Sequence, residues 1–531
     1  MSAILPPYRS NLPAGRDDFG QLLHAEWTKL HTVRGWMIAL VVAGLLVVAM
    51  AYLATFHHQN YVQASPSSPV VAAHPLVPMG PSGEAVTDTF YFVHQPLQGN
   101  GSITVRLSSL TGLIAQSSGS GSPGHGNSQS SASQSQASPG LALWAKAGLI
   151  VKDGTRQGAP YAALMITGAH GVRLQYDYTH DIAGPPVAVS AASPRWLRLS
   201  RSGDLLSGAE SADGVHWTTV GSVRLAGLPG TVQAGLFVTS PPLASAHAFT
   251  SPTATSATAV FDQVSLAGHW PQGAWNGLAV GAGTLTPTLG SSGFRQSGGA
   301  FTVTGSGDIA PAVGDVGYTP EQSLQGVFVG LLVVIVLGAL FMTAEYRRGL
   351  IRTTLTASPR RGRVLAAKAL VLGAAAFAVG LIAAAISLPL GDRLLRVTGN
   401  YLYPVSALTE TRVILGTAAL FALAAVLALA LGTILRRGAG VVAAGVVLFV
   451  LPSVLGAAYL PTSAEQWLLR LTPAAGYAIQ QSLARYPQVS YAYTPANGYF
   501  PLAPWAGFAV LCAYVALALG VAALLLRRRD A

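Results

Sequence analysis

The sequence predicts an α-helical polytopic membrane protein with six transmembrane helices and a large all-β domain inserted after the first of them. Hydrophobic residues make up 51% of the 531 residues. Only 10% are charged, whereas soluble domains have about 25%. The apolar residues gather into uncharged stretches of about 20 residues, the length that crosses a membrane. Residues 57–323 contain no such stretch and are rich in Ser, Thr, Gly and short alternating patterns.

The predicted spans are the uncharged apolar runs. The first covers residues 36–56 and has aromatic residues near both ends. A polar leader, residues 1–18, is expected to be disordered. Between the two, residues 19–35 repeat apolar residues at helical spacing with charged residues among them, which predicts an amphipathic helix at the membrane interface. The five later spans are predicted at residues 324–344, 364–390, 413–435, 441–460 and 505–526.

Residues 57–323 are predicted to form a β domain. Short alternating runs with turn signals about every ten residues are typical of a sandwich. Asp213, followed by glycine between two such runs, indicates a hairpin. We place the sandwich at residues 84–268, interrupted by a flexible Ser/Gly-rich loop at 116–140, and a smaller β module at 270–318.

The basic residues predict the orientation in the membrane. About half of the 31 Lys and Arg residues lie in short segments on the side of the N-terminus. The positive-inside rule then places both termini in the cytoplasm, together with the loop 345–363 and the tail 527–531. The β domain and the loop 461–504 face outward. Arg far outnumbers Lys, and Ala, Gly and Pro are abundant, which suggests a GC-rich bacterial genome and therefore a bacterial plasma membrane.

Several kinds of chemistry are excluded or disfavoured. The net charge of +11 does not indicate nucleic-acid binding, because no basic stripe interleaved with aromatic residues is present. Cys512 is the only cysteine, so a disulfide framework is excluded. No Gly-Lys dipeptide occurs, so the chain has no P-loop and we expect no cofactor, with ATP bound on a partner. The predicted spans hold almost no ionisable residue, which argues against an ion-coupled carrier.

The loop after the second span, EYRRGLIRTTLTASPRRGR, has two interpretations. Its arginines could simply anchor the topology and bind acidic lipid headgroups. Alternatively, residues 349–356, stopped by Pro359, could form a short cytoplasmic helix that docks onto a partner.

Three separate motifs resemble the permeases of type-2 ABC exporters. They are LLHAEWTKLHTVRGW, EYRRGLIRTTLTASPRRGRVLAAK and LTPAAGYAI, in the expected order. The resemblance covers residues 19–56 and 324–531. It implies a half-transporter that pairs with a second copy or a homologous permease and works with a separate ATPase subunit. By position, the residues that match the ATPase contacts of such permeases are Glu26, Trp27, Lys29, Glu345, Arg348, Arg352 and Arg360.

The β domain resembles a concanavalin-like or laminin-G-like sandwich through motifs such as AKAGLIVK and SADGVHW. Glycoside hydrolysis needs two carboxyl groups about 5–9 Å apart. Only Glu210 has a nearby partner, Asp213, and the turn already uses that side chain. Aromatic side chains could stack on a cell-wall glycan, although such residues more often fill a sandwich core. The candidates for glycan contact are Trp196, Trp217 and Tyr176.

These observations favour the permease subunit of an ATP-driven exporter. The apolar spans suggest a hydrophobic or amphipathic substrate, and nothing resembles a docking site for a periplasmic-type binding protein, which favours export over import. An alternative function is that of a membrane-anchored extracellular glycan-binding receptor or adhesin. Six spans are more than an anchor needs, so the permease is the preferred interpretation.

Overall fold

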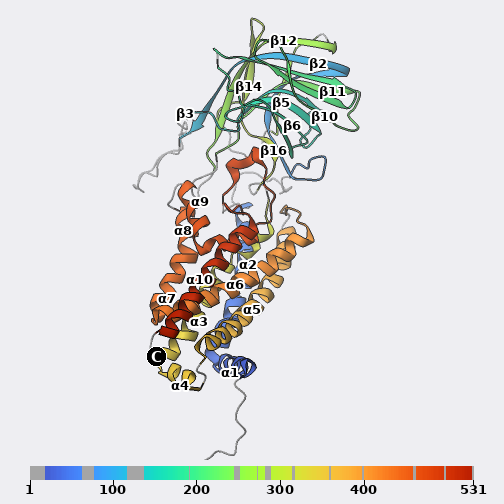
Figure 1. Cartoon of the computed structure of the whole chain (residues 1–531). Helices are drawn as coiled ribbons and strands as arrows, with labels where there is room; N and C mark the ends of the chain where they lie inside the picture. The colour runs from blue at the N-terminus through green and yellow to red at the C-terminus, as the bar shows by residue number, and fades with distance from the viewer. Residues whose placement is uncertain are drawn as a thin grey trace, which may run out of the picture.

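The computed structural model places a helical bundle below a β domain (Figure 1). Nearly all of the predicted leader 1–18, most of the predicted loop 116–140 and the last three residues of the chain lie outside the described residues. The described residues are 18–62, 77–116, 137–190, 192–243, 252–271, 273–281, 289–313, 317–357, 360–397, 400–458, 462–494 and 498–528.

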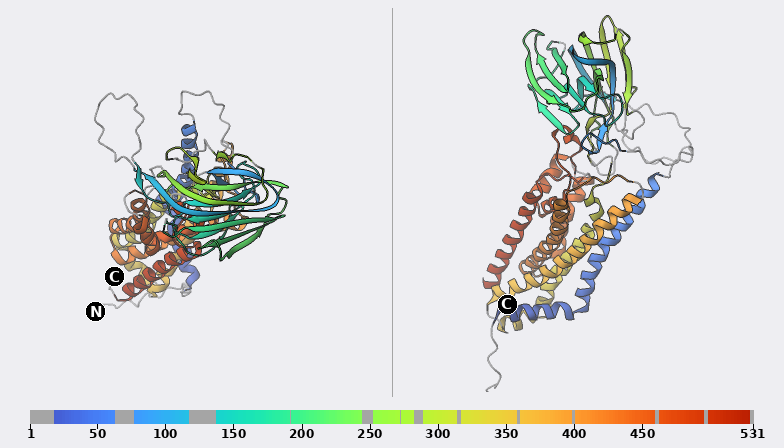
Figure 2. Two further views of the ribbon diagram at one scale, coloured as in Figure 1. Left: turned by 90° about the horizontal axis from the view of Figure 1, so that it is seen from above. Right: turned by 90° about the vertical axis from the view of Figure 1, so that its right-hand side faces the viewer.

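Five helices of the described residues are long and apolar enough to cross a membrane. Each overlaps a predicted span, which confirms the prediction of an apolar helical bundle. The helices run side by side along the long axis of the bundle (Figures 1 and 2). They are α2 (Arg34–Val62), α3 (Val327–Arg347), α5 (Arg361–Val397), α6 (Ala407–Leu435) and α10 (Pro504–Arg528).

The remaining predicted span, residues 441–460, is an interrupted helix. Helix α7 (Gly438–Gly445) continues through one π-helical turn, η2 (Val446–Val450), into α8 (Leu451–Ala458). Its apolar part, Gly438–Val454, is shorter than the five long helices. The π-helix is rare and occurs mostly as a single turn inserted in an α-helix, as it does at η2. The count of six membrane crossings therefore stays a prediction.

Two short helices lie at the end of the bundle that is farthest from the β domain (Figure 1). Helix α1 (Phe19–Thr32) corresponds to the predicted amphipathic helix, and Val33, whose backbone is extended, separates it from α2. Helix α4 (Leu350–Ala357) lies in the loop after α3, where a short helix was expected. The C-terminus lies at this same end (Figure 1).

The predicted loop 461–504 is largely helical. It contains α9 (Thr462–Leu471) and the 3₁₀ segments η3 (Pro473–Gln480) and η4 (Pro487–Ala492). All eight residues of η3 are buried, and η3 packs against α10 and α6. A Cβ atom at Gly507 of α10 would lie 2.3 Å from the carbonyl oxygen of Ala475, so this contact requires a glycine.

The β domain consists of two facing layers around an apolar core (Figure 2). The long strand β2 belongs to both. Its first half pairs with β11 and β13, its second half pairs with β8 and β12, and Gly99, with φ of +65°, lies between the halves. Strands of sandwiches change layer at such bends. The strands that build the layers are β2 (Phe90–Ala115), β3 (Ala137–Pro139), β4 (Lys146–Lys152), β5 (Tyr161–Thr167), β6 (Val172–Tyr176), β7 (His180–Ala183), β8 (Arg195–Ser202), β9 (Leu205–Ser211), β10 (Thr218–Arg224), β11 (Thr231–Thr239) and β12 (Thr255–His269).

The structure differs from the sequence analysis for residues 270–318. These residues do not form a separate module. Strand β13 (Asn276–Val280) pairs with β2, β15 (Ala300–Gly305) pairs with β12, and β14 (Gly293–Ser297) extends β15. The predicted hairpin is present as the antiparallel pair β9–β10. Local alternation identifies strands but does not reveal partners that are distant in the sequence.

A two-stranded neck carries the chain into and out of the β domain. It consists of β1 (Val86–Asp88) and β16 (Ile309–Pro311). Two fully buried ion pairs hold it against β4, with Nζ–Oδ distances of 2.6 Å for Lys146–Asp308 and 2.8 Å for Lys152–Asp88. Gln488 of η4 donates a hydrogen bond of 3.1 Å to the carbonyl oxygen of Tyr178. The β domain therefore packs directly on the adjacent end of the bundle.

Candidate functional site

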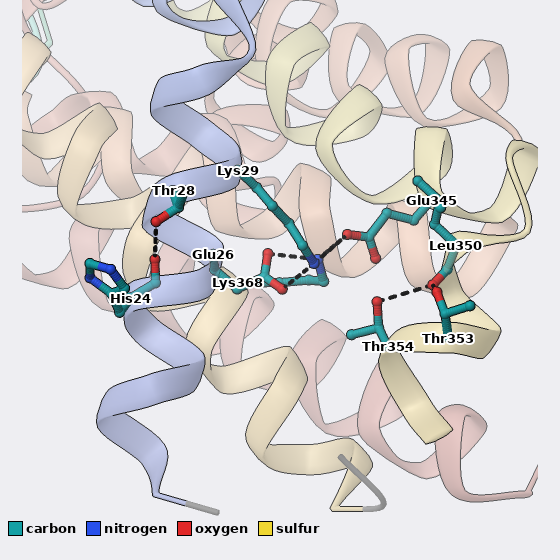
Figure 3. Close-up of polar contacts among 9 residues, drawn as sticks. All are labelled: His24, Glu26, Thr28, Lys29, Glu345, Leu350, Thr353, Thr354 and Lys368. Carbon is teal, nitrogen blue, oxygen red and sulfur yellow. Dashed lines mark hydrogen bonds and ion pairs between the residues drawn. The ribbon is translucent and has the colours of Figure 1, made fainter. Parts of the chain in front are cut away.

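Four charged side chains meet inside the bundle at the end that lies away from the β domain. Glu26 and Lys29 come from α1, Glu345 from the last turns of α3, and Lys368 from the first turns of α5 (Figure 3). We call these four residues the lysine–glutamate cluster. The spacing of three residues in α1 places Glu26 and Lys29 on one helix face.

Lys368 is the centre of this cluster. Its Nζ atom lies 2.8 Å from Oε2 of Glu26 and 2.6 Å from Oε1 of Glu345. The Nζ atom of Lys29 lies 2.8 Å from Oε1 of Glu26 and 3.2 Å from Oε1 of Glu345. Each ammonium group therefore bridges the same two carboxylates, and the cluster joins α1 to both α3 and α5.

The cluster is deeply buried on one side only. The side chain of Lys368 is 0% exposed, those of Glu26 and Glu345 are 2% and 7% exposed, and that of Lys29 is 39% exposed. Phe341 lies beside Lys368, with 5.2 Å between Nζ and the ring centroid. Two positive and two negative charges balance each other. This balance matters because an unpaired charge in such a place is strongly destabilising.

Lys29 is the member of the cluster that reaches solvent. Partial burial acts to lower the pKa of Lys29, but its hydrogen bonds and attraction to Glu26 and Glu345 outweigh burial and raise that pKa above its ordinary value. Lys29 is therefore held in its charged form. Its displacement would uncover two carboxylates.

The structure brings three of the seven predicted coupling residues together in the cluster, namely Glu26, Lys29 and Glu345. Trp27 is 48% exposed on the outer face of α1. Arg348 and Arg360 are exposed beyond the end of α3 and at the start of α5. Arg352 belongs to α4, but its side chain lies outside the described residues. The Oε2 atom of Glu345 is buried and has no hydrogen-bond partner among the described residues.

Sequence reasoning missed the role of Lys368, although the residue ends the motif EYRRGLIRTTLTASPRRGRVLAAK. The signal was available, because a lysine within an apolar helix is unusual and needs a partner. Its partner Glu26, however, is 342 residues away in the sequence. The low charge content of the spans obscured Lys368, where a fully buried charge is paired with two carboxylates.

The three glycan candidates lie on the β domain and are partly buried. Tyr176 stacks on His180 with 4.4 Å between ring centroids. Trp217 has the guanidinium of Arg198 over its ring at 3.8 Å and donates a hydrogen bond to the carbonyl oxygen of Gly214. Trp196 lies beneath Gly214, where an added Cβ atom would be 2.8 Å from its ring. All three therefore contribute to local packing, and none of these contacts brings the three rings together.

No group of three His, Cys, Asp or Glu side chains among the described residues could hold a metal ion. The chemistry that the described site offers is electrostatic: charge pairing that fixes the positions of three helices relative to each other.

Several solved structures resemble this chain at low sequence identity and low TM-score. A functionally unknown protein from Saccharomyces cerevisiae is 15% identical, with 35% of this chain and 76% of that chain covered and a TM-score of 0.21. A mutant GH43 protein from Bacillus licheniformis is 14% identical, covering 32% and 28% of the two chains with a TM-score of 0.19. Scytalido-glutamic peptidase is 7% identical, covering 43% and 100% with a TM-score of 0.25.

The family comparison is more informative. The search of curated proteins finds no match. The model of the ABC-2 family transporter proteins matches residues 128–531, which include α3, α5, α6, α10 and most of the β domain. This match confirms the resemblance that the sequence motifs suggested. The chain belongs to the ABC-2 family of transporter proteins, as a membrane component of a transport system.

Proposed function

We propose that the protein is the permease subunit of an ATP-driven exporter in a bacterial plasma membrane, with both termini in the cytoplasm and the β domain outside. It would work with a separate ATPase subunit and pair with a second copy of itself or with a homologous permease. The observation that carries this proposal is the convergence of Glu26, Lys29 and Glu345 on Lys368, because it links the predicted ATPase-contacting helices to the bundle.

The cluster provides a route for mechanical coupling. A partner that presses on the exposed side of α1, near Trp27, would move Glu26 and Lys29. These residues are tied to α3 through Glu345 and to α5 through Lys368. Interactions between buried, oppositely charged groups are short and directional, so displacement of α1 favours a matching movement of both long helices. Arg348 and Arg360 are exposed at the same end of the bundle as α1, where their charges are available to a partner.

The composition of the bundle supports a hydrophobic or amphipathic substrate. The five long helices are strongly apolar along their length. The large exposed side chains of α2 and α5, such as Leu45, Leu53 and Ile382, are also apolar. The charged groups of the lysine–glutamate cluster neutralise each other, which leaves little attraction for a bare ion.

Copurification tests the proposal and separates it from the receptor alternative. We expect the full-length chain, extracted in mild detergent, to retain an ATP-hydrolysing subunit, and we expect reconstitution to raise the hydrolysis rate of that subunit. Trp27→Ala combined with Arg348→Glu should weaken this retention. Trp467→Ala, at an exposed position on α9, is the matched control. Retention on purified cell wall that depends on Trp217, without any bound ATPase, would favour the receptor.

Thiol labelling of intact cells tests the orientation. Cys512 is first replaced by alanine. Val215→Cys, in the exposed turn between β9 and β10, should react with an impermeant reagent, whereas Thr356→Cys, on α4, should react only after the cells are opened. The reverse pattern would invert the proposed topology.

A further inference from the structure

A buried carboxyl group lies at the opposite end of the bundle, beneath the β domain. Glu321 belongs to the 3₁₀ turn η1 (Pro320–Leu324), which connects the neck of the β domain to α3. Its side chain is 9% exposed. The proposed coupling site does not use this residue, and η1 precedes the apolar helix that begins at Val327.

Glu321 is held by the segment between η3 and α10. Both the backbone N–H and the hydroxyl of Ser482 donate hydrogen bonds to its carboxylate, the first at 3.3 Å. Gly498 closes over the same group, since a Cβ atom there would lie 2.5 Å from Oε1 of Glu321. Gly498 has φ of +81°, a conformation that glycine adopts without strain. The carboxyl group of Glu321 is therefore hydrogen-bonded to one part of the segment, at Ser482, and covered closely by another, at Gly498.

The same segment also contacts the β domain. Gln488 is hydrogen-bonded to Tyr178, and Val489 packs with Ala310 of the neck and with Val313, which follows it. Leu483 lies against this apolar cluster as well. Opening of the segment would thus release the outer end of the bundle from the base of the β domain.

Few charges surround Glu321. Arg412, from α6, attracts it electrostatically, and its own hydrogen bond goes to the carbonyl oxygen of Gln481. Tyr499 is the neighbouring phenol. Gly391 of α5 lies against Ser323 of η1. The next residue of α5, Asp392, has its electrostatic interactions with Arg396 and Glu410. On α2, the contact next to η1 is apolar, between Gly326 and Val47.

We propose that Glu321 is a proton-dependent latch that holds the outer end of the bundle closed when its carboxyl group is protonated and loosens it when the group ionises. Burial of the side chain raises the pKa of Glu321 to about 7, against the opposing hydrogen bonds from Ser482. The carboxyl group therefore changes charge near neutral pH. Ionisation in this buried place is costly, and access of water to the group relieves the cost.

The latch can be tested in the full-length chain without any ATPase. In a background with Cys512→Ala, the labelling rate of Leu483→Cys reports opening of the segment. This rate is divided by that of Ser463→Cys, an exposed position on α9, to remove the effect of pH on the thiol itself. We expect the ratio to rise at least fivefold between pH 6 and pH 8. With Glu321→Gln, which keeps the neutral state, the ratio should stay low and flat.

Two further variants keep the test decisive if Glu321→Gln folds poorly. Ser482→Ala removes a donor to the ionised carboxylate, so the midpoint of the change should move to higher pH. Glu465→Gln removes another buried carboxyl group on the same side and should leave the profile unchanged. The latch is refuted if the native ratio does not vary with pH, if Glu321→Gln keeps the native pH dependence, or if Ser482→Ala leaves the midpoint in place. None of these outcomes depends on the proposed partner.

Discussion

Replacement of Lys368 by methionine should detach α1 from the bundle. Methionine has a similar length and fits an apolar site. The change leaves Glu26 and Glu345 buried with Lys29 as their remaining cation. Removing one partner of a buried ion pair typically costs about 3–5 kcal/mol. Because Lys29 still reaches both carboxylates, we expect the lower end of this range, about 3 kcal/mol.

Hydrogen exchange can measure this loss, since amide protection reports local opening. A cost of about 3 kcal/mol corresponds to roughly a 100-fold increase in the opening equilibrium, because each 1.4 kcal/mol is about tenfold. Protection of the amides in Phe19–Thr32 should therefore fall about 100-fold in Lys368→Met. Peptides from α9, at the other end of the bundle, serve as the internal control.

Two further variants test whether charge imbalance in the cluster causes the loss of amide protection in α1. Lys29→Met removes the half-exposed ammonium and should reduce protection much less, because solvent screens that position. Lys368→Met together with Glu26→Gln restores the charge balance, since Lys29 then pairs with Glu345 alone. Amide protection in α1 should therefore be at least tenfold higher than in Lys368→Met. If Lys29→Met loses as much amide protection in α1 as Lys368→Met, or if Lys368→Met leaves α1 protected, the buried pairing of Lys368 does not hold α1 on the bundle.

Three other substitutions or conditions have defined outcomes. Gly338→Ala places a Cβ atom 2.5 Å from the carbonyl oxygen of Ala425, so overpacking between α3 and α6 should cost about 1–3 kcal/mol and lower the Tm of the purified chain. An unchanged Tm would contradict this contact. Asp88→Asn leaves Lys152 buried without its anion and should cost about 3–5 kcal/mol, seen as loss of protection in β4, while Asp204→Asn, on the turn between β8 and β9, should have little effect. The pKa of Glu321 is about 7 in the folded chain, whereas its ordinary pKa is 4.5. The protonated group therefore contributes its full share of stability below pH 4.5, and this contribution is lost as the pH rises to about 7. The loss should be about 3 kcal/mol in denaturation between these pH values and should be absent in Glu321→Gln.

The apolar helices were predictable because each span is a local property of about 20 residues. The predicted runs overlap α2, α3, α5, α6 and α10, and the helix in the loop after α3 appears as α4. The β character of residues 84–268 was predictable for the same reason, since alternation and turn signals are local.

Contacts between distant parts of the chain were not predictable. The partner of Lys368 in α1 is 342 residues away, and the aspartate that pairs with Lys146 is 162 residues away. The pairing of β15 with β12 and the burial of η3 likewise arise from tertiary packing. The sequence of η3, PAAGYAIQ, lies within residues 461–504, which were predicted to form an outward-facing loop, whereas all eight of its residues are buried.

The most direct test of the account is the position at which an ATPase subunit touches the chain. A photo-crosslinking residue placed at Trp27, on the exposed face of α1, should cross-link to an ATP-binding subunit in membranes. The same residue placed at Trp467, on the exposed face of α9, should not. Cross-linking at Trp27 should be lost in Lys368→Met. Cross-linking at Trp467 instead, or at neither position in a membrane that transports, would contradict the claim that the lysine–glutamate end of the bundle couples the permease to its source of energy.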